Sequence, residues 1–354
     1  MKRIRTSCKT LLLALALAVL TSCGGARNAA LAQDAGAEKH QKQVFAMDTV
    51  MLLTAYGERA EEALAAAEER IYALERDLDP ESPAGSVYAL NAGAGSPVPI
   101  SEDCYNVMST AMDCWAASDG ALDPGMYPLS KAWGFIGGDY RVPEETEIRG
   151  LLALKNTQGI RMDEASYSAE LPAGMEVSFG AVAKGYTAQA ALDLMADMGV
   201  ESAILSLGGN VQTLGDTKPD GSKWQVAVTD PHDTGAYAGV LSVGQAAVVT
   251  SGGYQRFFQQ DGVTYIHILD PETGCPVQND LISVTVVTAD GARADALSTT
   301  LFVMGLDRAL DFYRAQGDFE LVLITADDRV LVTPGLADSF TETAPETFSY
   351  EYIG

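Results

Sequence analysis

Apolar and polar positions along the chain follow two periods, one typical of helices and one typical of strands. Apolar residues recur every three or four positions over residues 58–78, which predicts an amphipathic helix that the Asp79–Pro83 turn ends. Ser101 is placed to cap a helix over residues 101–117. Further helices are predicted over residues 86–91, 143–154, 180–198, 291–304 and 306–315.

Shorter apolar runs, rich in β-branched and aromatic residues, predict the strands. One strand is expected over residues 44–56, and a buried strand over residues 201–207 ends at a Gly-Gly-Asn turn. Others are expected over residues 223–229, 240–249, 254–259, 263–269, 282–288, 319–325 and 329–333. Hairpin-like strands with interspersed helices indicate an α+β fold with mixed and antiparallel sheets, not a doubly wound one.

The beginning of the chain indicates export. Four cations precede an apolar run over residues 11–20 that is too short to span a bilayer. Leu20-Thr21-Ser22-Cys23 resembles a bacterial lipobox, which implies cleavage before Cys23 and a lipid on its sulfur; an ordinary signal peptide that holds a cysteine is the alternative. We therefore predict a signal peptide (1–22), a polar lipidated tether (23–42) and one domain (43–354), anchored on the extracytoplasmic face of the cell membrane.

The charge of the chain narrows the range of partners. The formal net charge is −25, and removing residues 1–22, which hold four cations and no acid, would leave about −29. Such a surface opposes nucleic acid and anionic lipid, so we expect no nucleic-acid partner and membrane contact through the lipid only. An anionic protein that binds an anionic ligand needs a local cation, and a metal ion is one candidate.

The cysteines of the mature chain predict neither a disulfide nor a metal site. Cys104 and Cys114 would lie about 15 Å apart along one helix, too far for a bridge, and Cys275 has no evident partner. No Cys/His spacing typical of a metal site is present. All three are predicted to be free thiols.

Asp295 and Thr299 are candidates for holding a hard cation. Their spacing of four places both on one helix face near its N-terminus, where a carboxylate and a hydroxyl offer oxygen ligands of the kind that Mg²⁺ prefers. The alternative is that Asp295 only favours the helix N-terminus and Thr299 only packs.

His267 precedes a tight turn built from Asp270-Pro271 and Thr273-Gly274. The turn residues have a structural explanation, because the Asp270 side chain can bond to backbone amides. His267 is one of only three histidines, and it is either a site residue or a satisfied histidine at a strand edge.

Two glycine pairs follow predicted strands and can admit a ligand close to the backbone. Gly208-Gly209-Asn210 is one, and Thr250-Ser251-Gly252-Gly253-Tyr254, with Arg256 two positions on, is the other. Their hydroxyls and amides can hold phosphate. No G-x-G-x-x-G opens a helix after a strand and no Walker-type lysine motif occurs, which excludes the standard dinucleotide and nucleoside triphosphate sites.

Taken in order, seven motifs resemble those of the ApbE family of flavin transferases, and together they span nearly the whole mature chain. They are Met47-Asp48-Thr49; Asp123-Pro124 through Pro128-Leu129 with Trp133-Gly134-Phe135; Gly180-Ala181-Val182-Ala183-Lys184-Gly185-Tyr186; Leu207-Gly208-Gly209-Asn210; Thr250-Ser251-Gly252-Gly253-Tyr254; His267-Ile268 with Asp270-Pro271, Thr273-Gly274 and Pro276; and Ala294-Asp295-Ala296-Leu297-Ser298-Thr299.

The resemblance implies an ApbE-like, T-fold-related architecture and an enzyme that works outside the cytoplasm. It implies FAD as substrate, Mg²⁺ as cofactor, transfer of FMN to a threonine or serine hydroxyl of an exported acceptor flavoprotein, and release of AMP. Two alternatives stay open. They are a Mg²⁺-dependent FAD pyrophosphatase that yields FMN and AMP, and an FAD-binding lipoprotein without chemistry.

The resemblance also implies roles for particular residues. The metal would be held by Asp295, Thr299 and the backbone carbonyl of Ala181. Either Asp295 or His267 would take the proton of the acceptor hydroxyl. The remaining residues implied to lie along the ligand are Met47, Pro124, Gly125, Met126, Ser178, Lys184 and His267.

This chain departs from the family pattern at three positions. Ser178 stands where the family commonly has an aspartate that contacts FAD, and Gln189 stands where another aspartate is often found. Asp48 replaces a common glycine. Serine can still form a hydrogen bond but carries no charge, so the affinity for the ligand or its geometry would differ.

Overall fold

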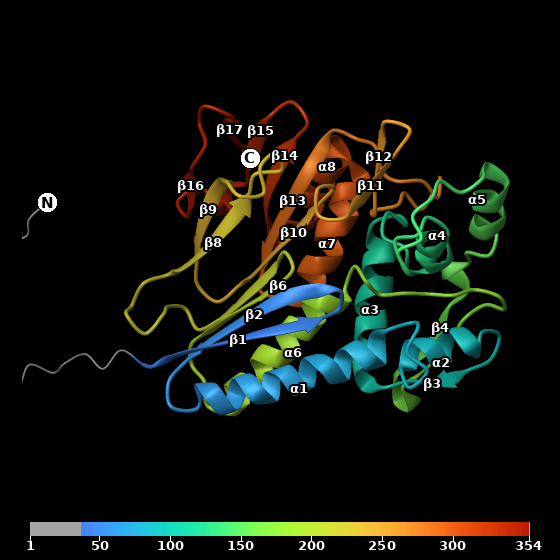
Figure 1. Cartoon of the computed structure of the whole chain (residues 1–354), viewed down its shortest axis with the longest axis horizontal. Coiled ribbons are helices and arrows are strands. Elements are labelled where there is room, and N and C mark those ends of the chain that lie inside the picture. Colours follow the sequence, from blue (N-terminus) through green and yellow to red (C-terminus); the bar gives the residue numbers. More distant parts are fainter. Residues whose placement is uncertain (1–36, 354) are drawn as a thin grey trace, which may run out of the picture. The chain divides into compact units, whose positions relative to one another are not determined.

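The computed structural model describes residues 37–353, and Figure 1 shows their arrangement. The predicted signal peptide and the lipidation at Cys23 lie outside these residues. Within the described part of the chain, no helix combines the length and the apolar character needed to cross a bilayer.

A nine-stranded sheet forms the centre of the fold (Figure 1). Its order is β1-β2-β6-β7-β10-β13-β14-β15-β17, and every neighbouring pair is antiparallel except β15 with β17. The strands are β1 Lys39–Ala46, β2 Thr49–Tyr56, β6 Ala203–Leu207, β7 Asn210–Leu214, β10 Ala247–Gly252, β13 Leu281–Thr288, β14 Glu320–Thr325, β15 Arg329–Val332 and β17 Ser349–Tyr352.

Three smaller sheets accompany the large one. The first, in the order β16-β9-β8, packs through a shared apolar cluster onto β10, β13, β14 and β15. The second is the hairpin β11-β12, and the third has the order β3-β5-β4. Their strands are β3 Val98–Pro99, β4 Arg161–Asp163, β5 Ser168–Glu170, β8 Trp224–Thr229, β9 Tyr237–Val243, β11 Phe257–Gln260, β12 Val263–Ile266 and β16 Phe340–Glu342.

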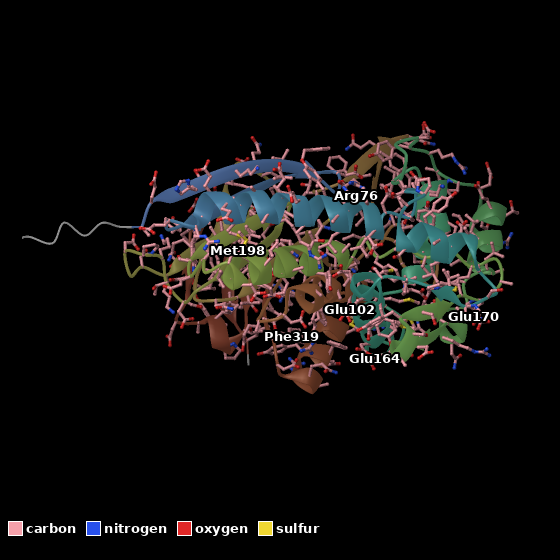
Figure 2. The ribbon with its side chains drawn as sticks, turned by 90° about the horizontal axis from the view of Figure 1, so that it is seen from below. Arg76, Glu102, Glu164, Glu170, Met198 and Phe319 are labelled. Carbon is pink, nitrogen blue, oxygen red and sulfur yellow. The ribbon has the colours of Figure 1, made fainter. Side chains whose placement is uncertain are left out.

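Helices α1 (Ala60–Leu78) and α6 (Ala183–Asp197) lie side by side and share an apolar cluster with β1, β2 and β6 (Figure 2). Helix α7 (Gly291–Met304) packs between α6, α3 and the sheet. The remaining helices are α2 Ser86–Ala92, α3 Glu102–Ala117, α4 Tyr127–Ala132, α5 Glu145–Leu152 and α8 Leu306–Gln316, with 3₁₀ turns at Pro124–Met126, Thr157–Gly159, Glu164–Ser166 and Pro334–Leu336.

Alternation along the strands explains why the helices cover one face of the sheet. Along β2, Met51 and Leu53 are fully buried towards the helices, whereas Val50 and Leu52 point outwards and are about half exposed. The Ser101 side chain accepts a hydrogen bond from the Cys104 amide, so the predicted cap of α3 is confirmed. The predicted α+β class with mixed and antiparallel sheets is also confirmed.

Two of the predicted strands are wrong, because in the structure a turn divides each of these runs between two separate strands. The run 44–56 belongs to two strands joined at Met47 and Asp48, whose φ angles of 49° and 57° form a tight left-handed turn. The first of these strands begins at Lys39, so residues 39–42 belong to the sheet and not to the predicted tether. The run 240–249 is likewise divided between β9 and β10.

The strands β3, β7, β16 and β17 were not predicted from the sequence. Cys104, Cys114 and Cys275 are free, as expected.

Candidate functional site

Helices α6 and α7 meet at Gly185, where the GAVAKGY and ADALST motifs come together. The Gly185 amide donates a hydrogen bond of 2.8 Å to Oδ2 of Asp295. A Cβ atom at Gly185 would lie 2.0 Å from the Gly291 carbonyl oxygen and 2.7 Å from the Asp295 Cβ. The small residues of this motif therefore allow a close helix contact that holds the Asp295 carboxylate in place.

Asp295 is a buried acid whose environment favours a cation nearby. It is only 4 % exposed. Burial raises the pKa of Asp295, while the charge of Lys184 and the Gly185 amide oppose that rise. A buried carboxylate is costly unless it is compensated, and a bound metal ion is one effective compensation.

Thr299, one turn further along α7, lies at the end of β10. Its Oγ1 is 3.3 Å from Oγ of Ser251, which in turn lies 2.8 Å from Oγ of Ser298. The fold thus brings the Ser251 hydroxyl of the Thr-Ser-Gly-Gly-Tyr segment against the helix that carries Asp295. Sequence spacing predicted the shared helix face but not the contact with Ser251.

The Ala181 carbonyl precedes α6 and is free to act as a ligand. Within residues 37–353, no backbone amide donates to this carbonyl, because the Gly185 amide one turn later donates to Asp295 instead. One carboxylate, one hydroxyl and one carbonyl would offer oxygen donors of the kind that Mg²⁺ prefers, with phosphate or water completing its coordination. Residues 37–353 contain no cluster of three or more His, Cys, Asp or Glu residues that could hold a metal by themselves.

Buried amides support this helix junction from the sheet. The Gln212 Nε2 donates to the Gly185 carbonyl at 2.8 Å and to the Asn210 Oδ1 at 2.9 Å, and both side chains are 1 % exposed. Neither the Asn210 Nδ2 nor the Gln212 Oε1 forms a hydrogen bond of regular geometry in the described part of the chain, but the Asn210 side chain is near enough to Asp295 to oppose the rise of its pKa. Gln212 was not predicted as a site residue; the signal that the sequence offers for it is an amide between the apolar residues of a short strand.

His267 is neutral in its folded environment. Burial, together with the charges of Arg256 and Lys184, lowers the pKa of His267 to about 4. Its backbone amide donates to the Arg256 carbonyl, and its Nδ1 lies 3.1 Å from the same oxygen. Since a neutral ring must donate from Nδ1 to that carbonyl, Nε2 is left as an acceptor.

The turn between β1 and β2 carries Met47 towards this region. The Met47 amide donates to Oε1 of Glu75 at 2.6 Å, and Oδ2 of Asp48 lies 3.5 Å from Nη2 of Arg256. Glu75 was not predicted, and nothing in the sequence distinguishes it from the other acids of α1. Through Asp48 and Arg256, the first motif is connected to the segment that holds His267.

The Pro124-Gly125-Met126 loop is connected to two other motifs. The Ser178 amide donates to the Pro124 carbonyl at 3.0 Å, and Oδ1 of Asp123 accepts from the Gly125 amide at 2.9 Å. Lys155 pairs with Asp123 at 3.1 Å and donates to the Pro271 carbonyl at 2.8 Å. The loop is therefore fixed against both Ser178 and the turn that follows His267.

The predicted site residues differ in how directly the structure joins them. No hydrogen bond within residues 37–353 connects His267 to Asp295, but the charge of Lys184 acts on both. Lys184 itself lies 3.4 Å from the Gly180 carbonyl. Direct polar contacts join Asp48, Pro124, Ser178, Gly185, Arg256, Asp295 and Thr299 to another predicted segment, whereas the Met47 amide contacts Glu75 of α1.

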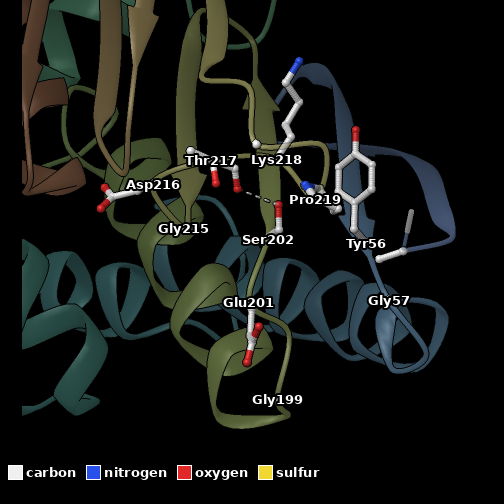
Figure 3. Close-up of a pocket in the computed structure, with 12 residues that line it drawn as sticks. Tyr56, Gly57, Gly199, Glu201, Ser202, Gly215, Asp216, Thr217, Lys218 and Pro219 are labelled. Atoms are coloured by element: carbon white, nitrogen blue, oxygen red, sulfur yellow. Dashed lines mark hydrogen bonds between the residues drawn. The ribbon is translucent and has the colours of Figure 1, made fainter. Parts of the chain in front are cut away.

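Two of the surface cavities bear on the position of the site. One, of about 470 Å³, is bounded by Tyr56, Ser202 and Lys218 at the opposite end of β2 and β6 from the Met47 turn (Figure 3). It contains none of the predicted site residues. The other, of about 500 Å³, is bounded by Asp123, Lys155 and Pro271 and adjoins the Pro124 loop.

Comparison with known proteins assigns the chain to a family. The model of the ApbE family matches residues 47–323. An FAD:protein FMN transferase of Klebsiella pneumoniae (strain 342) is 37 % identical over 254 residues, which cover 70 % of this chain and 78 % of the relative. One of Treponema pallidum (strain Nichols) is 31 % identical over 337 residues, which cover 90 % of this chain and 91 % of the relative.

Solved structures agree with the family model. The ApbE protein of Thermotoga maritima superimposes with a TM-score of 0.76 at 26 % identity, covering 87 % of this chain and 98 % of that structure. The flavinyl transferase ApbE of Pseudomonas stutzeri in its apo form superimposes with a TM-score of 0.74 at 26 % identity, covering 88 % and 97 %. The chain therefore belongs to the ApbE family.

Proposed function

We propose that this protein is an FAD:protein FMN transferase that moves the FMN half of FAD onto a threonine or serine hydroxyl of an acceptor protein. The relatives that bear this name cover most of the chain. The observation that carries the proposal is the buried Asp295 carboxylate, held by the Gly185 amide beside the hydroxyls of Thr299 and Ser251. This is the setting in which a diphosphate and its cation would be bound.

In the proposed reaction, the acceptor oxygen attacks the FMN-side phosphorus of FAD. A new P–O bond forms to the acceptor, the bond from that phosphorus to the bridging oxygen breaks, and AMP leaves with that oxygen. Asp295, Thr299 and the Ala181 carbonyl would hold Mg²⁺, which would neutralise charge on the diphosphate. Lys184 adds a fixed positive charge beside Asp295.

The acceptor hydroxyl must lose its proton, and His267 is suited to take it. Its ring is neutral near pH 7 and keeps Nε2 as a free acceptor, and the negative charge of a bound diphosphate would raise its low pKa towards the range of an effective base. Asp295 is the alternative base, but it would share its oxygens with the metal and with the Gly185 amide. We assign the proton transfer to His267 and the metal to Asp295.

Ligand contacts and cellular location complete the proposal. Met47, Pro124, Gly125, Met126 and Lys184 would line the dinucleotide, with Ser178 supplying a hydroxyl instead of a carboxylate. The acceptors would be exported flavoproteins, met by an enzyme that a lipid on Cys23 anchors to the outer face of the cell membrane.

The test is release of AMP from FAD in the presence of Mg²⁺, with and without an exported acceptor protein that carries a flavinylation threonine. The expected result is AMP release that depends on the acceptor, with covalent FMN on that threonine. AMP and free FMN without an acceptor would identify a pyrophosphatase instead. FAD binding without AMP release would identify a carrier, and Ser178→Asp would then be the next variant.

A further inference from the structure

Asp48 and Arg256 form a loose ion pair beside His267. Nη2 of Arg256 lies 3.5 Å from Oδ2 of Asp48, and the two side chains are 37 % and 80 % exposed. A pair this open to water contributes little to stability. A ligand with greater negative charge would therefore displace the Asp48 carboxylate readily.

The Arg256 side chain is held by a further contact besides its ion pair with Asp48. Nη1 donates to the Phe135 carbonyl at 3.2 Å, and the backbone carbonyl of Arg256 accepts from the His267 amide. The Arg256 charge also acts on the His267 ring. Since the guanidinium has five N–H donors and these contacts within residues 37–353 use two, a planar cation with open donors is fixed next to His267.

Asp48 occupies a backbone conformation that favours glycine. Its φ of 57°, next to a φ of 49° at Met47, places two consecutive side-chain-bearing residues in the left-handed region. Within residues 37–353, Arg256 is the one polar partner of the Asp48 side chain. Position 48 therefore holds a residue whose backbone conformation is unfavourable, and the polar partner of its side chain is Arg256.

We propose that Arg256 binds the diphosphate of the dinucleotide and that Asp48 competes for the same guanidinium, so that the pair sets the affinity for anionic ligands. The proposal rests on the proposed function, which supplies FAD as the ligand. In a chain with a formal charge of −25, a fixed guanidinium is where a diphosphate would be drawn, because Arg binds two phosphate oxygens at once.

Binding of FAD, and of riboflavin as a probe without phosphate, tests the proposal at constant Mg²⁺ by calorimetry. Asp48→Asn should tighten FAD binding about two- to fivefold, the size expected for an exposed ion pair, and leave riboflavin binding unchanged. Arg256→Gln should weaken FAD binding, and adding Asp48→Asn to it should have no further effect.

Asp261→Asn is the matched control. Asp261 is an exposed aspartate with a φ of 52° in the β11–β12 turn, so its substitution changes the net charge equally in a similar backbone conformation. Thermal unfolding of every variant shows whether it is folded. An Asp48→Asn effect equal to that of Asp261→Asn, or one that persists without Arg256, would overturn the proposal.

The outcomes also separate this proposal from the proposed function. The expected binding pattern without FMN transfer to any acceptor would retain the ion-pair competition and reject the transferase. FMN transfer by the wild-type protein, together with an Asp48→Asn variant that binds FAD as the wild type does, would support the transferase and reject the ion-pair competition. Absence of FAD binding by the wild-type protein would reject both.

Discussion

The Gly185 amide and the Asp295 carboxylate are 110 residues apart in the sequence and 2.8 Å apart in the fold. The contact requires glycine, because any side chain at position 185 would collide with α7. This hydrogen bond turns the Asp295 carboxylate of the ADALST motif towards the first turn of α6, which carries the GAVAKGY motif. The proposed metal site therefore depends on how closely α6 and α7 pack.

Replacing Asp295 should abolish FMN transfer. Asp295→Asn keeps the shape of the side chain but removes the charged oxygen ligand, so we expect a loss of about 100-fold or more. AMP release from FAD and stabilisation by Mg²⁺ in thermal unfolding measure the effect. Asp290→Asn, at the N-cap of the same helix, is the control and should retain transfer. Wild-type turnover in Asp295→Asn would refute the metal assignment.

Gly185→Ala should destabilise the protein and disturb the site together. Its Cβ would lie 2.0 Å from the Gly291 carbonyl oxygen, so α6 and α7 must move apart, at a cost of about 1–3 kcal/mol. Urea unfolding measures this cost. Gly180→Ala, five residues earlier, is the matched control, because a Cβ there meets nothing within 4 Å. Equal stability of the two variants would show that the helices do not approach this closely.

Stability should fall as the pH drops from about 6.5 towards about 4. The folded pKa of His267 is depressed from 6.5 to about 4, so the unfolded chain binds the proton first and acid favours unfolding. The free energy of unfolding that the neutral His267 ring contributes is fully present above pH 6.5 and is lost as the pH falls from 6.5 to about 4. Its size is on the order of 3 kcal/mol. His267→Gln should show a shallower slope in urea unfolding over that range, and an unchanged slope would contradict the depressed pKa.

Tyr186→Phe should cost about 1 kcal/mol of unfolding free energy. The Tyr186 hydroxyl donates to Asp103 at 2.8 Å, and Asp103 also accepts from both terminal guanidinium nitrogens of Arg70, so the bond links α6 to α3 and α1. The exposed Tyr88 provides the control, and Tyr88→Phe should be close to neutral. The prediction fails if urea unfolding gives the two variants the same stability.

Local sequence patterns were sufficient to predict a helix where the segment carries its own start and stop signals. The helix over residues 101–117 was predicted from Ser101 and the apolar spacing, and the structure begins it at Glu102. The pair Asp295 and Thr299 was assigned to one helix face from its spacing alone. Seven short motifs indicated the family, because turns, glycines and polar side chains are specified within a few residues.

The division of residues 44–56 into two strands was not predictable in this way. Met47 and Asp48 lack the glycine or proline that usually marks a turn, and the apolar run continues across them. Antiparallel pairing of β1 with β2, and of β2 with β6, stabilises the reversal. Those bonds form between segments that no local pattern connects.

Local patterns along the chain are enough to specify the α+β class, most helices and the identity of the residues that can carry chemistry. The contacts of the Gly185 amide with Asp295, of Ser251 with Thr299, and of Arg256 with both Asp48 and His267 arise only in the folded chain. Folding also decides the low pKa of His267, which arises from burial and from two cations distant in sequence. The physical reason is that secondary structure depends on neighbours a few residues away, whereas burial and charge–charge contacts depend on segments that only folding brings together.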